Sequence, residues 1–520
     1  MIARGGASAL HSAGLARSQD AVLLSVLLDA GVEPDAGAPR RPVRARLVAA
    51  LRAAAASGRL SGGTRLPSSR TLARELRVSR TTVEGVYAEL DAEGLLERRA
   101  GSGTYLSRAG AARERLAGVP PWRGAMPRQA REELSGFSAR GRALVDEAAE
   151  LLSPPVRCFT PCVPDAAAFP LAAWNRLQAR RARSAAALTG VLDPLGAPEL
   201  RAALSEHLAA SRGVRCTADE VLVGSSAQEL LALAARALLA PGDAAWLEDP
   251  GYLGARVALR SAGARLVPVP VDGDGLRVEA GLRLAPRARL AYVTPSHQYP
   301  LGVALGLARR RALLAWAQRA GAWVFEDDYD GAFVFEGRPL AAIAALDAAG
   351  AGEPRVLHCT SFNKLLFPGL RLACLVGPAG VVKALALARL AEVGPAPTLP
   401  QLVLADFIRG GQLAAHVRRM RALYEERRAA LRDAVERVRA GVLRLDPARA
   451  GLHGLLRLRP GADDRAVSAS AAAAGLDLPP LSRYALRGGG PPGLLVGFAG
   501  PSTAELRAGI QRLGRLLDAG

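Results

Sequence analysis

The hydrophobic residues between positions 40 and 108 repeat at helical spacing in three short runs and then follow a strand pattern. The third run begins after Ser79, a residue type that caps helix N-termini, and stops at Gly94. Residues 95–99 and 104–106, on the two sides of a Gly-rich turn, predict a two-stranded ribbon. Three short helices followed by a hairpin predict a winged helix-turn-helix domain.

A different pattern starts at about residue 153 and continues to the end of the chain. Segments of helical length alternate there with short apolar runs, at 221–223, 245–247, 266–269, 290–293, 323–325 and 372–376. This alternation predicts an α/β domain with a largely parallel central sheet. We therefore expect a multidomain chain with a partly disordered N-terminal extension (1–39), an α+β winged helix-turn-helix head (40–108), a linker (109–152) and an α/β domain (153–520).

Charge favours a polyanionic partner for the head. The chain has a formal net charge of +20, and residues 40–108 hold 14 arginines against 6 acidic residues. The third helix of the head begins with Ser79-Arg80-Thr81-Thr82, which places a guanidinium and three hydroxyls at a helix N-terminus. Such groups bond phosphate oxygens and base edges, so we expect double-stranded DNA as a partner.

Cysteine usage and hydropathy predict a cytoplasmic protein. The five cysteines are odd in number and scattered, which predicts reduced thiols rather than disulfides. Cys158 and Cys162 form a CxxxC pair without a second pair, so we expect no metal site. The apolar run at 21–28 is too short to cross a membrane.

Only two lysines, Lys364 and Lys383, occur among the 68 basic residues. Arginine cannot replace lysine where an amine must attack a carbonyl, because a guanidinium keeps its proton. Ser361 precedes Lys364 by three residues and Arg371 follows it by seven, and their side chains suit a phosphate. Lys364 is therefore a candidate for Schiff-base chemistry with a phosphorylated cofactor.

Further segments carry groups that suit the same cofactor. Asp327 and Tyr329 follow the predicted strand 323–325, at the strand end where ligands bind in open α/β sheets. An aspartate there suits a protonated pyridine nitrogen, and the tyrosine suits a phenolic ring oxygen. The turn after strand 221–223 offers backbone N–H groups to a phosphate, and Tyr252 offers a ring for stacking.

The head closely resembles the GntR family of winged-helix repressors and activators. The resemblance rests on the segments 63–73, 78–83, 93–96 and 101–104. It implies that the residues contacting DNA are Arg70, Ser79, Arg80, Thr81 and Thr82, with Gly101 of the wing entering the minor groove. Glu84 departs from the resemblance, because some family members place a basic contact at that position.

The α/β domain resembles the fold-type I pyridoxal-phosphate enzymes of the aspartate aminotransferase family. The segments 249–252, 295–300 and 326–330 look specifically like the MocR/GabR subfamily, in which a GntR head is fused to an aminotransferase-like domain. The resemblance implies that Lys364 carries pyridoxal 5'-phosphate as an internal aldimine. It also implies cofactor contacts from Asp327 (ring nitrogen), Tyr329 (ring oxygen), Tyr252 (stacking) and, at the phosphate, Ser225, Ser226, Ala227, Ser361 and Arg371.

Two departures from the aminotransferase pattern bear on function. The Asn-Pro-x-Gly turn of the family reads Tyr-Pro-Leu-Gly at 299–302, so the asparagine contact is absent or remade through His297 or Gln298. Leu495 takes the position of the arginine that clamps a substrate carboxylate, although Arg483 and Arg487 are near in sequence.

These features predict a transcription regulator that binds DNA through its head and senses pyridoxal phosphate or an amino compound on Lys364. The absent carboxylate clamp favours the cofactor itself as the signal. The alternative is an active aminotransferase that carries a DNA-binding domain, and the sequence leaves both open. The resemblance also implies a homodimer, because the fold-type I site is built at a dimer interface.

Overall fold

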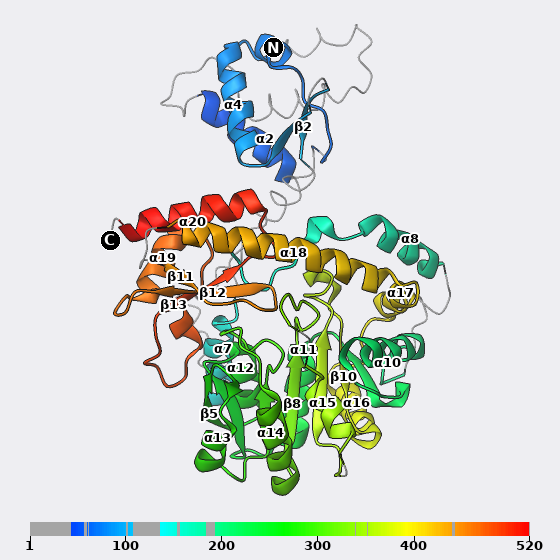
Figure 1. Cartoon of the computed structure of the whole chain (residues 1–520). Helices are drawn as coiled ribbons and strands as arrows, with labels where there is room; N and C mark the ends of the chain where they lie inside the picture. Colours follow the sequence, from blue (N-terminus) through cyan, green and yellow to red (C-terminus); the bar gives the residue numbers. More distant parts are fainter. Residues whose placement is uncertain are drawn as a thin grey trace. The chain divides into compact units, whose positions relative to one another are not determined.

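The structure is a computed structural model that describes residues 43–56, 60, 62–99, 102–107, 136–152, 156–183, 193–337, 340–350, 352–438 and 443–518. The chain divides into two compact units, Met1–Arg123 and Gly124–Gly520. The first unit contains the head and the second contains the α/β domain (Figure 1). The predicted extension at 1–39 and the predicted wing residue Gly101 lie outside the described residues.

Among the described residues, three helices and a hairpin form the head, as the hydrophobic pattern predicts. They are α2 (Val43–Ala56), α3 (Ser69–Glu75), α4 (Arg80–Ala92), β1 (Leu96–Arg99) and β2 (Gly103–Leu106). Ser68 and Ser79 are the N-caps of α3 and α4, since each side chain accepts a hydrogen bond from a backbone N–H three residues further on. The apolar faces of the helices meet in one core, which includes Leu47, Leu51, Leu72, Val83, Val86 and Leu90.

An eight-stranded sheet in the order β3-β10-β9-β8-β7-β4-β5-β6 forms the centre of the second unit. Its strands are β3 (Val221–Gly224), β4 (Ala244–Asp249), β5 (Arg265–Asp272), β6 (Gly275–Leu276), β7 (Leu290–Val293), β8 (Trp323–Asp328), β9 (Val356–Ser361) and β10 (Ala373–Val376). The neighbours from β5 through β4, β7 and β8 to β9 pair in parallel, whereas β10 and β6 pair antiparallel. The prediction of a largely parallel sheet is confirmed.

Alternate residues of these strands enter two different cores, because side chains alternate across a strand. Leu222, Tyr292 and Phe325 pack in a core with the helices of one face, which are α11 (Ala227–Leu238), α12 (Leu253–Ser261) and α16 (Ala379–Glu392). Residues such as Ala291 and Val324 pack on the other face. The helices there include α10 (Pro198–Arg212), α13 (Val278–Leu284), α14 (Leu307–Ala320) and α15 (Ile343–Ala348). Helices therefore cover both faces of the sheet (Figure 1).

The C-terminal part of the chain adds a smaller antiparallel sheet in the order β11-β12-β13. Its elements are β11 (Leu443–Leu445), β12 (His453–Leu458) and β13 (Gly493–Gly497), with α18 (Gln412–Glu436), α19 (Asp464–Ala473) and α20 (Thr503–Asp518) packed around them. Helices α8 (Leu171–Ala182) and α17 (Thr398–Arg409) pack against each other. Helix α7 (Ala139–Ala149) falls within the predicted linker and contacts α12, where Glu147 forms an ion pair with Arg260.

Candidate cofactor site and DNA-binding surface

The predicted cofactor residues meet at one edge of the eight-stranded sheet. Asp327 lies in β8, and Lys364 follows the neighbouring parallel strand β9, so both come from the carboxyl ends of adjacent strands. They line a cavity of about 150 Å³, together with Ser226, Ala227, Gln228, Tyr252, Tyr292, Thr294, Tyr299, Tyr329, Ser361, Asn363 and Arg371. Eight of the nine predicted cofactor residues line this cavity, and the exception is Ser225.

Ser225 makes a hydrogen bond within the protein through its backbone. Its backbone N–H donates a hydrogen bond of 2.6 Å to Oε2 of Glu229, one turn into α11. The sequence pattern did not single out Tyr292, Thr294, Tyr299 or Asn363 as lining residues. Tyr292 could have been found, because it lies near the end of a predicted strand of the same parallel sheet.

Lys364 lies over the ring of Tyr329, with its Nζ atom 4.1 Å from the ring centroid. Burial acts to lower the pKa of this amine, but the acidic groups around it, which include Cys162 and Asp327, outweigh that effect and raise it. The free amine is therefore held as an ammonium ion close to the carboxylate of Asp327. The other lysine of the chain, Lys383, is exposed on α16 and lies 3.5 Å from Asp219.

Asp327 presents one carboxylate oxygen that has no hydrogen-bond partner. Its Oδ2 atom accepts a hydrogen bond of 2.7 Å from Tyr292, whereas Oδ1 is buried and unpartnered among the described residues. Burial raises the pKa of this carboxyl, and Lys364 and the Tyr292 hydroxyl lower it. A buried carboxylate oxygen without a partner costs free energy unless a donor meets it, and the protonated nitrogen of a pyridine ring is such a donor.

Other residues of the lining suit a phosphate. Ser226 is the N-cap of α11, and Ala227 is the first residue of that helix, so unpaired backbone N–H groups and the helix dipole face this region. Arg371 adds a guanidinium, held there by a left-handed backbone conformation with φ of 53°. The donor set of the cavity therefore fits both the ring nitrogen and the phosphate of pyridoxal phosphate.

The turn at 299–302 does not bring His297 or Gln298 into the cavity. The Gln298 side chain donates hydrogen bonds to the backbone oxygens of Pro250 and Tyr299 and so holds the turn in place. His297 is bonded to Asp330 and lies 3.0 Å from the Tyr329 hydroxyl. Of these residues Tyr299 itself lines the cavity, so the family's asparagine contact is not remade through either side chain predicted for it.

Leu495 is fully buried in β13 and belongs to an apolar cluster with Leu253, Leu455, Leu481 and Tyr484. Tyr299 packs against this cluster from the side of the cavity. Neither nearby arginine lines the Lys364 cavity, since Arg483 bonds Glu150 and Arg487 lines a different cavity. Among the described residues that line the Lys364 cavity, the cations are Lys364 and Arg371.

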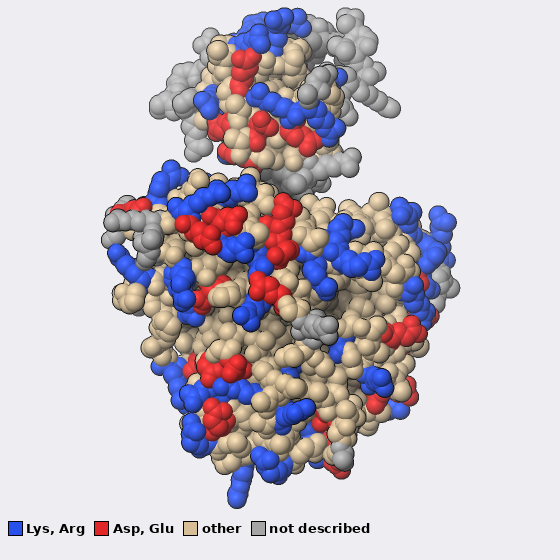
Figure 2. Space-filling model, viewed as in Figure 1, with Lys and Arg blue, Asp and Glu red and all other residues tan. Residues whose placement is uncertain are grey.

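The start of α4 carries most of the predicted DNA contacts. Ser79 accepts a hydrogen bond of 3.0 Å from the N–H of Thr82, so its hydroxyl is engaged in capping the helix. Arg80 is exposed but donates to Glu84 at 2.7 Å, and Thr81 is also exposed. Arg70 is exposed on α3. Figure 2 shows basic side chains gathered over the head with acidic ones between them.

Comparison with known proteins identifies both parts of the chain. Residues 43–106 match the gntR family of bacterial regulatory proteins, and residues 163–513 match the aminotransferase class I and II family. The chain is 38% identical to the probable rhizopine catabolism regulatory protein MocR of Rhizobium meliloti, over 91% of this chain and 93% of that protein. It is 30% identical to the pyridoxine biosynthesis transcriptional regulator PdxR of Corynebacterium glutamicum, over 90% and 95% of the two chains.

Solved structures show the same fold for the second unit. The α-aminoadipate aminotransferase LysN of Thermus thermophilus, complexed with N-(5'-phosphopyridoxyl)-L-leucine, superposes with a TM-score of 0.64 at 26% identity, over 77% of this chain and 99% of that one. The kynurenine aminotransferase of Pyrococcus horikoshii superposes with a TM-score of 0.65 at 23% identity, over 76% and 97%.

No helix among the described residues is both long and apolar enough to cross a membrane. The gntR domain makes the chain a DNA-binding protein, and the cofactor of its second domain is pyridoxal phosphate. The chain therefore belongs to the MocR-type transcriptional regulators, in which a gntR helix-turn-helix domain precedes an aminotransferase class I and II domain.

Proposed function

We propose that this protein regulates transcription by sensing pyridoxal phosphate, or an amino compound that reacts with it, at Lys364. The observation that carries the proposal is the apolar surroundings of Leu495 beside a cavity whose cations are Lys364 and Arg371 among the described residues. With Arg371 engaged by the phosphate, no second guanidinium remains in that lining to hold a substrate carboxylate.

The proposed roles of the cavity residues follow from their positions. Lys364 holds the cofactor, Asp327 accepts from the ring nitrogen, and Tyr252 stacks on the ring. The Tyr329 hydroxyl bonds the ring oxygen. Ser226, Ala227, Ser361 and Arg371 hold the phosphate, and Ser225 supports that turn through its bond to Glu229. When bound, pyridoxal phosphate supplies an aldehyde that condenses with amines and a ring that accepts electrons.

The missing clamp matters more for turnover than for sensing. Each charge-assisted hydrogen bond that a carboxylate loses weakens binding by about 1.5–3 kcal/mol. An amino acid without this anchor also loses the orientation that proton transfer requires, because catalysis depends on near-attack geometry. The cofactor itself keeps its phosphate, ring and lysine contacts, so the site still binds pyridoxal phosphate while it processes amino acids poorly.

We also propose that the protein acts as a cytoplasmic homodimer. The solved neighbours share a fold whose active site is usually built from two subunits, which supports the dimer. A regulator of the gntR family must reach chromosomal DNA, which in bacteria lies in the cytoplasm. Two heads in one dimer would read a paired operator, with the spacing of its half-sites set by the dimer.

The test combines operator binding with a turnover assay on the full-length protein. An operator is selected from random double-stranded DNA, and its affinity is measured with and without pyridoxal phosphate and a panel of amino compounds. We expect one of these ligands to change the affinity by about 5- to 150-fold, the usual range of allosteric coupling, and Lys364→Ala to remove the response.

The second arm decides between the two functions. Turnover of an amino donor with a keto acid is expected to stay near the uncatalysed rate. Steady turnover would establish the aminotransferase alternative, and a full ligand response in Lys364→Ala would rule out sensing at this lysine.

A further inference from the structure

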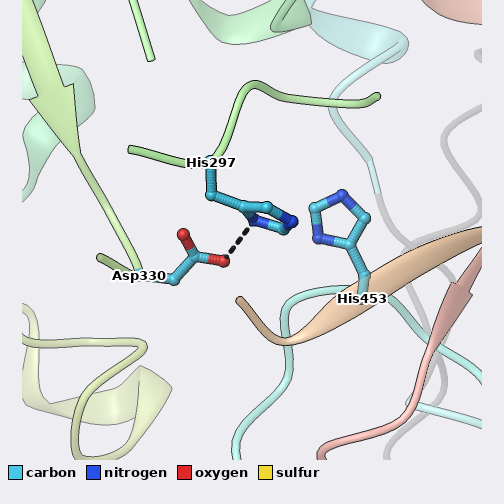
Figure 3. A group of neighbouring side chains, drawn as sticks. All are labelled: His297, Asp330 and His453. Atoms are coloured by element: carbon cyan, nitrogen blue, oxygen red, sulfur yellow. Dashed lines mark hydrogen bonds and ion pairs between the residues drawn. The ribbon is translucent and has the colours of Figure 1, made fainter. Parts of the chain in front are cut away.

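A group of titratable side chains lies next to the cofactor cavity but does not line it. His297 follows β7, Asp330 follows β8 and His453 is the first residue of β12, so three elements far apart in sequence bring them together. Their exposed fractions are 1%, 1% and 0%, and one ligand atom from each lies within 4.8 Å of the others. Figure 3 shows the three side chains converging.

Hydrogen bonding assigns the proton of His297. Its Nδ1 atom is 3.0 Å from both Oδ2 of Asp330 and the Tyr329 hydroxyl. A carboxylate can only accept whereas a hydroxyl can do either, so Nδ1 carries the hydrogen and shares it between the two oxygens. The other ring nitrogen, Nε2, therefore has a lone pair. This atom is buried without a hydrogen-bond partner among the described residues. It points toward the ring of His453 (Figure 3).

The same reasoning assigns the proton of His453. Its Nε2 atom is 3.4 Å from the carbonyl oxygen of Pro300, which can only accept, so the hydrogen lies on Nε2. The lone pair on Nδ1 is then free to accept, and the Sγ atom of Cys162 lies 3.5 Å from it.

Each imidazole is thus anchored through one nitrogen and presents the other as a base. This is the arrangement of metal-binding histidines, whose second nitrogen donates to a carboxylate or a backbone carbonyl. Two imidazole nitrogens and a thiol form a donor set that prefers zinc and its neighbours in the first transition row over magnesium or calcium. One carboxylate oxygen of Asp330 lies within 4.8 Å of a ring nitrogen of each histidine, and its Oδ1 atom is buried without a hydrogen-bond partner among the described residues.

We propose that Nε2 of His297, Nδ1 of His453 and Sγ of Cys162 bind a transition-metal ion, zinc first among them, with Asp330 orienting His297. Binding replaces the S–H hydrogen of Cys162 with a bond from sulfur to the metal, and the proton leaves to solvent. Cys162 is partly exposed, whereas both histidines are buried.

Two glycines pack closely against His297 and Asp330, at positions where a larger side chain would not fit. Gly451 has φ of +82°, and a Cβ atom there would lie 2.1 Å from Nδ1 of His297 and 2.5 Å from Oδ2 of Asp330. Gly302 has φ of +74°, and a Cβ atom there would lie 3.1 Å from Nε2 of His297. Any side chain at Gly451 would therefore displace the His297–Asp330 pair.

The experiment uses the full-length protein with its pyridoxal phosphate in place. The protein is incubated with zinc, desalted, and analysed for metal content, and cobalt is then titrated as a spectroscopic substitute. We expect one zinc per chain, and cobalt d–d bands of the intensity typical of tetrahedral sites together with a sulfur-to-cobalt charge-transfer band. Visible d–d bands lie at longer wavelength than the cofactor absorbs, so the two signals are read separately.

Variants locate the site. His297→Gln and His453→Gln should abolish stoichiometric retention, and Cys162→Ser should remove the charge-transfer band. Asp330→Asn should weaken cobalt affinity by about 10- to 100-fold, as expected for a group that orients a ligand. The matched controls are His207→Gln in α10 and Cys158→Ser, since neither residue belongs to the group.

Two results would overturn the proposal. One is a wild-type protein that retains no zinc and shows no cobalt spectrum. The four side chains would then form a hydrogen-bonded network that binds no metal. The other is unchanged binding in the ligand variants. If either histidine variant fails to fold by circular dichroism, Cys162→Ser decides, because serine is close to cysteine in size and replaces the sulfur with an oxygen. The outcome does not depend on whether Lys364 senses an effector.

Discussion

The phenol of Tyr292 donates a hydrogen bond of 2.7 Å to Oδ2 of Asp327, and the second oxygen of that carboxylate remains buried without a partner among the described residues. The tyrosine lies in β7 and the aspartate in the adjacent parallel strand β8. Pairing of these strands therefore fixes one oxygen of Asp327 and leaves the other to meet the cofactor.

Tyr292→Phe should lower the affinity of the protein for pyridoxal phosphate. Without the hydroxyl, the pKa of Asp327 rises further and its carboxylate is free to rotate, because the Tyr292 hydrogen bond both lowers that pKa and orients the group. A bond to a charged group is worth about 1.5–3 kcal/mol, so the dissociation constant should rise by at least about tenfold. The dissociation constant is measured by titrating pyridoxal phosphate into protein from which the cofactor has been removed and recording tryptophan fluorescence. Tyr424→Phe, a buried tyrosine of α18, is the control, and equal affinity in both variants would contradict the role of Asp327.

Lys364→Ala should abolish the absorbance band of the lysine-bound cofactor, whereas Lys383→Ala should leave it unchanged. The two residues are the only lysines of the chain, and they differ in position alone. One lines the cavity, and the other lies on the exposed surface of α16 beside Asp219. Spectra of the purified variants, recorded after addition of pyridoxal phosphate and removal of the excess, provide the measurement. A band that survives in Lys364→Ala would show that another amine holds the cofactor.

Arg80→Ala should reduce operator affinity by about 1–3 kcal/mol if this arginine reads a base. Arg80 and Glu84 are 2.7 Å apart with exposed fractions of 56% and 45%, and exposed pairs of this spacing contribute only about 0.3–0.5 kcal/mol. DNA can therefore displace Glu84, and Glu84→Gln should raise affinity modestly by freeing Arg80.

The control for these DNA measurements is Arg236→Ala, which removes an exposed, ion-paired arginine of the second unit. Fluorescence anisotropy on operator and random DNA separates the possible contacts. An equal loss on both sequences would identify Arg80 as a phosphate contact rather than a base contact.

Glu248 should make stability depend on pH near neutrality. This carboxyl accepts hydrogen bonds from Thr294 and Gln298, and burial raises its pKa from 4.5 to about 7. Between these two values the unfolded chain releases the proton and the folded chain keeps it, so stability falls as pH rises through this window and levels off above about 7.

Glu248→Gln should flatten this dependence, because the amide is neutral at every pH. The melting temperature of the variant should rise relative to wild type as pH increases from about 5 to 8. The exposed Glu353→Gln serves as the control. A variant that tracks wild type across the range would show that Glu248 does not titrate there.

The sequence by itself determined the elements and most of the cofactor residues. The head's three helices and hairpin, the α/β alternation and the serine caps follow from local spacing, which neighbouring residues dictate without reference to the rest of the fold. Asp327 and Ser226 were accessible for the same reason, since each follows a strand that the pattern predicts, and parallel strands end at one edge of a sheet. Lys364 was found from composition instead, as one of two lysines in the chain, because the pattern did not predict the strand β9 that precedes it.

Tertiary structure alone decided which side chains are bonded to other parts of the protein and are therefore not available to the cofactor site. Arg483 bonds Glu150, and the Gln298 side chain bonds the backbone oxygen of Pro250. Both contacts join segments far apart in sequence, which local spacing does not encode. The CxxxC spacing gave no reason to expect a metal site. His297, Asp330, His453 and Cys162 come from four separate segments, and only strand order and the close approach of Gly451 bring them together.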